Sequence, residues 1–179
     1  MVDVRWEANP LNDNLLLPGP VGEYVEIVDI DPPSGCAYDP VDLNDPFLLA
    51  QDGLAPSEGN PQFHQQMVYA VAMRTVETFE AALGRTALWA AKRRKNEWTD
   101  RRTGRKTTDY DEHYIQRLRI YPHALRQANA FYSPDKVALL FGYFPELRPG
   151  GDGDALGGMV FTCLSHDIIA HETTHALLD

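Results

Sequence analysis

The chain has 179 residues, 44% hydrophobic and 23% charged, a composition typical of a globular domain with its own core. No apolar run approaches the roughly 18 residues that span a bilayer, so we expect no membrane partner. The net charge of −10 disfavours nonspecific nucleic-acid binding by the chain as a whole. The first ten residues, MVDVRWEANP, lack the charged-then-apolar pattern of a secretory signal, which favours a cytoplasmic protein. Cys36 and Cys163 are too few for a disulfide framework and are expected to be reduced.

Residues 1–59 are predicted to form an extended, proline-rich segment that packs on the remainder of the domain. Nine of the 13 prolines lie in residues 1–61. Proline fixes φ and removes a backbone donor, so the segment should consist of loops rather than helices. Residues 22–30 are an exception, because their β-branched and aromatic side chains predict a strand.

The second part, residues 60–179, opens with the clearest helix of the sequence. Asn60 is a favourable N-cap, Pro61 suits the first turn, and Gly84 is positioned to end the helix. Apolar side chains recur at steps of three and four residues, which predicts a wide buried stripe. The stripe comprises Phe63, Met67, Val68, Val71, Val76, Phe79 and Leu83.

A basic cluster follows the helix, with eight of the 16 lysines and arginines lying between Lys92 and Lys106. One interpretation is a surface for nucleic acid or another anionic partner. Acidic residues within 97–112 dilute the positive field, however. A solvated hairpin or loop, with its turn at residues 103–104, is therefore the favoured interpretation.

Three later segments have strand character. Apolar residues and arginines alternate at 117–120, which predicts a half-exposed strand. Residues 137–144 form a continuous apolar run flanked by prolines, which predicts a buried strand. Residues 159–162 predict a short strand, after glycine-rich loops at 149–154 and 157–158. Helices and strands in this order predict an α+β fold.

The sequence motif with the clearest chemistry is His-Glu-Thr-Thr-His at 171–175, on a helix that we expect to begin at Ser165. His171 and His175 are four residues apart, so both imidazoles project from one helix face and can bind a single Zn²⁺. Glu172 is adjacent to His171 and can accept a proton from the water that attacks a carbonyl group. These residues predict a zinc hydrolase.

At this point the sequence resembles the thermolysin-like zinc peptidases, or gluzincins. The resemblance rests on the helix that ends in His-Ala-Leu-Leu-Asp179, on Asn129-Ala-Phe-Tyr132 and on Phe161-Thr-Cys-Leu-Ser165, and it covers about residues 60–179. It implies a zincin-like N-terminal lobe, in which a mixed or antiparallel sheet packs against the long helix and the zinc-site helix.

The resemblance also implies an endopeptidase that holds a peptide or protein substrate against a sheet edge. Asn129 would bond the substrate backbone through its side chain and Ala130 through its main chain, with Phe131 beside them. An unpaired strand edge is a physically suitable template for an extended peptide. A plain turn is the alternative role for Asn129.

Three neighbouring residues are given ordinary roles. Asp167 matches a position that helps bind calcium in thermolysin, but one carboxylate cannot supply the six to eight oxygens that Ca²⁺ takes. We therefore interpret Asp167 as a charge at the helix N-terminus. His123 and His166 are interpreted as surface or hydrogen-bonded histidines.

A third protein ligand for zinc is missing from the pattern. Asp179 is eight residues after His171, about 12 Å further along a helix, and nothing in the spacing favours Glu146 or Asp135. In gluzincins the third ligand is a glutamate on a later helix. We therefore expect a missing C-terminal lobe of the same polypeptide and an inactive isolated chain. A non-catalytic protein- or peptide-binding module derived from a peptidase is the alternative.

The missing lobe also predicts an exposed apolar surface on the last helix. The residues concerned are Ala176, Leu177 and Leu178. Because exposed apolar patches tend to find partners, this surface predicts a dimer formed through the cleft.

Overall fold

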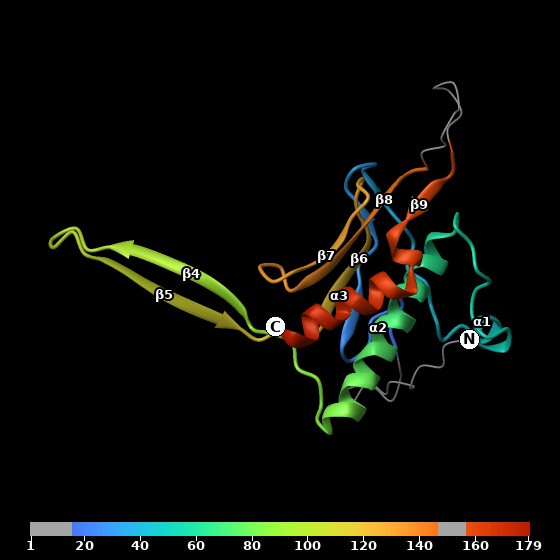
Figure 1. The fold of residues 1–179 in the computed structure, drawn as a ribbon, viewed down its shortest axis with the longest axis horizontal. Helices are drawn as coiled ribbons and strands as arrows, with labels where there is room; N and C mark the ends of the chain where they lie inside the picture. The colour runs from blue at the N-terminus through green and yellow to red at the C-terminus, as the bar shows by residue number, and fades with distance from the viewer. Residues whose placement is uncertain (1–15, 147–156) are drawn as a thin grey trace.

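The computed structural model describes residues 16–146 and 157–179 (Figure 1). Its elements form a mixed α+β fold with three α-helices in the described part of the chain. In chain order they are β1 (Val25–Ile27), β2 (Ile30–Asp31), β3 (Cys36–Ala37), α1 (Pro46–Ala50), α2 (Pro61–Leu83), β4 (Lys92–Thr99), β5 (Lys106–His113), β6 (Leu118–Leu125), β7 (Ala130–Ser133), β8 (Ala138–Pro145), β9 (Met159–Phe161), the 3₁₀ turn η1 (Thr162–Leu164) and α3 (His166–Leu178). The predicted α+β class is confirmed.

Helix α2 begins and ends where the sequence predicted. The Asn60 side chain accepts a hydrogen bond from the Gln62 N–H at 3.0 Å, and Gly84 ends the helix in the left-handed conformation with φ 66°. The predicted stripe is buried at Val68, Val71 and Val76. The stripe prediction is wrong at its end, since Leu83 is 57% exposed. The last turn of α2 extends beyond the sheet that covers its earlier turns.

The main sheet is mixed, with the strand order β1-β6-β8-β7 and with β9 also paired to β8. β6 lies parallel to both β1 and β8, whereas β7 and β9 are antiparallel to β8. The strands predicted at 117–120, 137–144 and 159–162 are thus confirmed as β6, β8 and β9. Of the predicted loops, 149–154 lies outside the described residues. Gly158 accepts a hydrogen bond from the Glu146 N–H at 2.8 Å where β9 meets β8.

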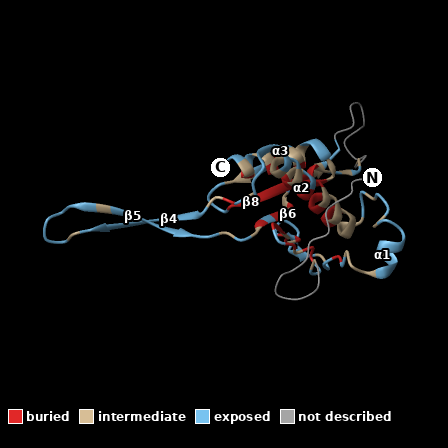
Figure 2. Cartoon of the chain, turned by 90° about the horizontal axis from the view of Figure 1, so that it is seen from below, coloured by how far each residue is buried: buried red, intermediate tan, exposed pale blue. Residues whose placement is uncertain are grey.

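The hydrophobic core lies between this sheet and two helices. Helices α2 and α3 pack against each other; α2 lies against β1 and β6, and α3 against β7 and β8 (Figures 1 and 2). The largest fully buried apolar side chains come from both layers: Phe141, Met73, Leu118, Ile120, Leu139 and Ile169. This packing fixes one face of α3 and leaves its opposite face outside the core.

The described part of the N-terminal segment, residues 16–59, joins the sheet through β1 and packs on the start of α2. The Val41 N–H donates to Gln65 Oε1 at 2.8 Å, and the strand predicted at 22–30 is divided into β1 and β2. The short helix α1 was not expected among the prolines. It forms because Pro46 occupies its first turn and Asp45 caps it by accepting from the Phe47 N–H at 2.8 Å.

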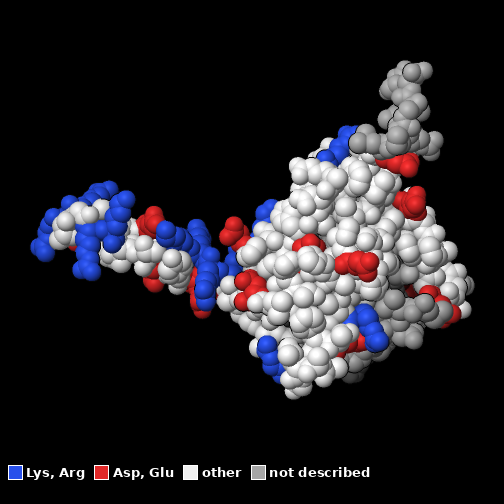
Figure 3. Space-filling view, in the orientation of Figure 1, with Lys and Arg blue, Asp and Glu red and all other residues white. Residues whose placement is uncertain are grey.

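The basic cluster forms a two-stranded arm that projects from the body (Figures 1 and 3). β4 pairs with β5 from Lys92↔His113 to Thr99↔Lys106, and Gly104 takes φ 67° in the turn, so the favoured hairpin interpretation is confirmed. All but one of the strand residues are exposed. The arm carries eight Lys and Arg against five Asp and Glu, a net +3, so the remaining chain carries −13.

Candidate functional site

Helix α3 presents the two histidines of the His-Glu-Thr-Thr-His motif on its outer face. Ser165 is at the N-cap position, as predicted, but its side chain makes no capping bond; the Ile169 N–H bonds its carbonyl oxygen instead, at 3.1 Å. Ile169, Thr173 and Ala176 are buried against the core. His171 and His175 are therefore turned outward, and both are exposed.

The two imidazoles of the motif meet at their outer nitrogens. His171 Nε2 and His175 Nε2 are 3.0 Å apart, and the ring planes are nearly perpendicular at 89°. This separation follows from the four-residue spacing on one helix face. The two imidazoles thus point to one place, as the sequence predicted, and the binding of a metal ion there stays a prediction.

Glu172 lies between α3 and the edge strand β7. Only 9% of Glu172 is exposed, and its Oε2 accepts a hydrogen bond from the Tyr132 N–H at 2.9 Å. The carboxylate thus bridges the motif helix to the backbone of β7. The side chains around it form an open hollow of about 530 Å³. The hollow is lined by Phe131, Tyr132, Pro134, Glu172, His175, Leu178 and Asp179.

Strand β7 has a free edge on the side of this hollow, since within the described residues it pairs only with β8. The Tyr132 N–H points away from β8, toward Glu172. Backbone direction alternates with period two in an antiparallel ladder, so the N–H and C=O of Ala130 face the same open side. Phe131 is 37% exposed beside them.

Asn129 is exposed and directly precedes β7. Its carbonyl oxygen accepts hydrogen bonds from the Gly142 N–H at 2.9 Å and from Thr162 Oγ1 at 3.4 Å. Gly142 allows this close approach because a Cβ there would lie 2.2 Å from the Gln127 carbonyl oxygen. The structure thus brings Asn129, Ala130 and Phe131 to the same sheet edge as Glu172.

At the end of α3, the Tyr132 hydroxyl donates to Asp179 Oδ2 at 2.8 Å. Burial, together with the Asp179 carboxylate, raises the pKa of Tyr132 well above its usual value. The phenol therefore remains a donor at neutral pH. In the described ranges 16–146 and 157–179, no third His, Cys, Asp or Glu gathers with His171 and His175, and this holds for Asp135, Glu146 and Asp179.

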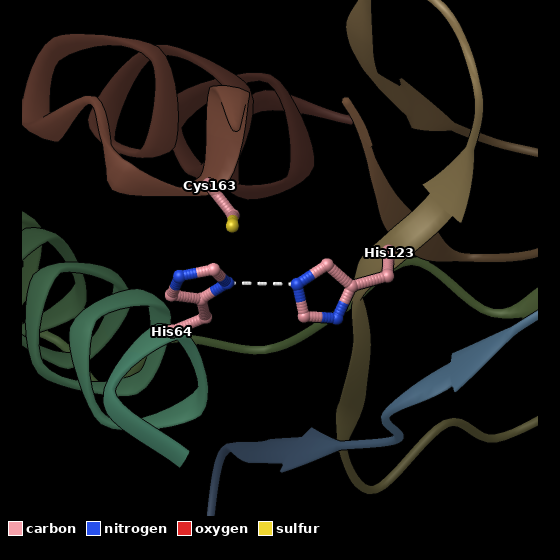
Figure 4. A group of neighbouring side chains, drawn as sticks. All are labelled: His64, His123 and Cys163. Atoms are coloured by element: carbon pink, nitrogen blue, oxygen red, sulfur yellow. Dashed lines mark hydrogen bonds between the residues drawn. The ribbon is translucent and has the colours of Figure 1, made fainter. Parts of the chain in front are cut away.

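A second group of ligand-type side chains is buried in the body, and it was not predicted from the sequence. His64, His123 and Cys163 have ligand atoms that all lie within 4.8 Å of one another (Figure 4). We call these residues the buried His–His–Cys group. His64 comes from the first turns of α2, His123 from β6 and Cys163 from η1. The protein therefore has a buried group that could bind a metal ion.

Close polar contacts hold both rings of this group in place. His64 Nδ1 lies 2.8 Å from His123 Nε2, and His123 Nδ1 lies 2.6 Å from Asp29 Oδ1. Burial, and then the charge of His123, lowers the pKa of His64 to about 4. Burial raises the pKa of the Cys163 thiol. All three members of the group are at most 2% exposed.

One sequence signal could have found His64. It lies four residues before Val68 and seven before Val71, in phase with the buried stripe of α2. A histidine at such a position must find a polar partner in the core. His123 was expected to be an ordinary surface or hydrogen-bonded residue. Its position near His64 and Cys163 brings together three distant segments that sequence spacing cannot relate.

Together, the fold and the α3 geometry define a mixed α+β protein with a His-Glu-x-x-His helix beside a free sheet edge. No protein-family model matches the chain, and no curated protein or solved structure is significantly similar to it. Within residues 16–146 and 157–179, no helix has both the length and the apolar character that a membrane crossing requires.

Proposed function

We propose that this chain supplies half of the active site of a zincin-like zinc peptidase. The observation that carries the proposal is the contact between α3 and β7. His171 and His175 direct two nitrogens to one point, while Glu172, on the same helix, accepts the N–H of a strand with a free edge. This arrangement puts two metal ligands, a carboxylate and a peptide-sized backbone template side by side.

In this proposal His171 and His175 hold Zn²⁺ through their Nε2 atoms. Bound zinc supplies the Lewis acidity that makes water a nucleophile at neutral pH. Glu172 takes a proton from the attacking water and delivers it to the amine nitrogen that leaves. The bond from the Tyr132 N–H fixes the direction of the carboxylate, so the free oxygen, Oε1, is the one that carries the proton.

The free edge of β7 is the proposed peptide-binding element. Ala130 would bond an extended substrate strand through its N–H and C=O, and Asn129 through its side-chain amide. The third zinc ligand and the groups that stabilise the transition state would come from a further lobe of the polypeptide, as the resemblance to gluzincins implies. Two histidines alone fill half of a tetrahedral zinc shell.

Replacing Glu172 with Gln, in the complete polypeptide that carries this chain, tests the proposal. Glutamine keeps the shape and the Tyr132 contact but cannot accept the proton. We expect cleavage of a quenched fluorescent peptide library to fall by at least about 100-fold, with the zinc content unchanged. Asp167→Asn is the matched control, because Asp167 is exposed on the same helix and should leave turnover intact. Full turnover by the Glu172→Gln protein would contradict the proposal.

A non-catalytic peptide-binding module is the second candidate, supported by the absence of a third ligand beside His171 and His175 in the part of the chain described. Both candidates use the edge of β7, so Ala130→Pro should weaken peptide binding in either case by removing one outward N–H. They differ in turnover. Peptide binding that depends on Ala130, without cleavage by the complete polypeptide in the presence of zinc, would favour the module.

A further inference from the structure

The contacts of the buried His–His–Cys group leave no hydrogen for the two ring nitrogens that face each other. The outer nitrogen of each ring faces a fixed acceptor: His64 Nε2 lies 3.0 Å from the Glu58 carbonyl oxygen, and His123 Nδ1 lies 2.6 Å from Asp29 Oδ1. A carbonyl oxygen and a carboxylate cannot donate, so both outer nitrogens must carry the hydrogen. Each neutral ring then has its lone pair on the inner nitrogen.

The two inner nitrogens face each other at 2.8 Å (Figure 4). Two lone pairs at this distance repel unless a cation lies at them. Only a proton or a metal ion between the two nitrogens can remove this repulsion. A proton would place the positive charge of an imidazolium in a site that is at most 2% exposed. Cys163 Sγ points toward the same place from η1 and adds a third donor of the type that binds zinc.

We propose that the buried His–His–Cys group is a binding site for a divalent transition-metal ion of the zinc type. The ligands are His64 Nδ1, His123 Nε2 and Cys163 Sγ. The outer contacts are those that typically support a metal-bound histidine, because Asp29 and the Glu58 carbonyl hold the ring hydrogens and so fix both tautomers. This site shares no residue with the His-Glu-Thr-Thr-His motif and does not depend on the proposed peptidase function.

Charge balance favours a divalent ion. When the ion binds, the S–H bond of Cys163 breaks and the thiol proton is released to the solvent. The divalent ion then balances one thiolate and one carboxylate, and the buried site remains neutral overall. A monovalent ion would leave a net negative charge in the core, at a high desolvation cost.

The location of the group indicates what the ion would do. It would join the first turns of α2, the strand β6 and the turn η1, three segments that are far apart in sequence. η1 leads directly into Ser165 and α3, so the ion would anchor the start of the motif helix. Phe161 packs over both rings, with ring centroids 4.6 Å from His64 and 5.5 Å from His123, and shields the site from water.

Cobalt titration of the metal-free chain tests the site, because a Co²⁺–thiolate bond gives a charge-transfer band in the near ultraviolet. The chain has only two cysteines, and Cys36 is exposed. We therefore expect Cys36→Ser to keep the band in full and Cys163→Ser to lose it. Calorimetry with Zn²⁺ in buffers of different ionisation enthalpy should report release of the thiol proton at this site.

The double variant His171→Ala with His175→Ala separates the two metal sites. In this background one ion should still bind per chain, with the thiolate band unchanged and with a higher melting temperature than the metal-free protein. Absence of the band in the Cys36→Ser protein, whose only thiol is Cys163, would overturn the proposal even if the Cys163→Ser protein fails to fold. That result would not contradict the proposed peptidase site. Conversely, loss of peptide cleavage alone would not contradict the proposed metal site at the buried His–His–Cys group.

Discussion

At the scale of single residues, Gly142 sets the spacing between β8 and the entrance to β7. A Cβ at this position would lie 2.2 Å from the Gln127 carbonyl oxygen and 2.7 Å from that of Asn129. Backbone atoms cannot rotate away as a side chain can, so the strands must move. We expect Gly142→Ala to lower the free energy of unfolding by about 1–3 kcal/mol, measured by urea denaturation. Gly158→Ala is the control, with nothing within 4 Å of its Cβ; equal effects in both variants would contradict the steric explanation.

Asp31 supplies a pH-dependent contribution to stability. Burial raises its pKa, but hydrogen bonds from Ser34, Tyr143 and Tyr38 outweigh burial and hold the pKa below its ordinary value. Its folded pKa is thus below the unfolded one, so the stabilisation is complete above about pH 4 and is lost as the pH falls through the folded pKa. The contribution comes from the ionised carboxylate and its donors.

Tyr143→Phe removes the hydroxyl that donates to both Asp31 oxygens, at 2.8 and 3.0 Å. We expect a loss of about 1.5–3 kcal/mol at pH 7, measured by urea denaturation. The difference in unfolding free energy between the variant and the unsubstituted protein should shrink as the pH falls below 4. Protonated Asp31 is uncharged, so it gains less from the hydrogen bond of Tyr143. Tyr110→Phe, at an exposed position of β5, is the control. A difference that stays constant from pH 7 to pH 3 would contradict the assignment to Asp31.

At the scale of elements, the arm formed by β4 and β5 adds little to the stability of the body. Nearly all of its residues are exposed, and a two-stranded ribbon without a further layer is only marginally stable. Lys92 pairs with His113 at its base, so a short Asn-Gly turn can join these positions in place of residues 93–112. We expect this deletion to change the free energy of unfolding by less than about 0.5 kcal/mol. Loss of a cooperative thermal transition would show that the arm supports the fold.

At the scale of the whole molecule, the exposed apolar surface beside the motif helix is smaller than the sequence predicted. Leu178 is 71% exposed and Phe131 37%, but the expectation of an exposed Ala176 was wrong, since it is 2% exposed. Ala176 belongs to the helix face that packs on the core. The exposed pair borders the hollow next to Glu172.

We expect weak self-association of the isolated chain through this surface, seen as a rise in sedimentation coefficient with concentration. Leu178→Lys should abolish the rise, because it introduces a charge that would be desolvated in the contact. Phe47→Lys, at an 83% exposed position on α1, should leave it unchanged. A chain that stays monomeric at every concentration would remove the prediction of a dimer.

The sequence by itself determined the features that depend on neighbours along the chain. Helix α2 was predicted from its cap at Asn60 and its end at Gly84, the arm from its turn, and the meeting of His171 with His175 from their four-residue spacing. Each follows from local geometry, since 3.6 residues make one helical turn and two strands need a tight turn between them.

Only the tertiary structure decided which distant residues meet. The bond from the Tyr132 N–H to Glu172 joins positions 40 residues apart, and the link between His64 and His123 spans 59. No spacing rule relates such residues, because their approach depends on the parallel pairing of β6 with β8 and on the packing of α2 and α3 over them. The same packing buried His64, His123 and Cys163 together, which three isolated polar positions in a sequence could not indicate. Whether a residue is buried depends on how the sheet and the helices pack around it, and not on the residue type alone.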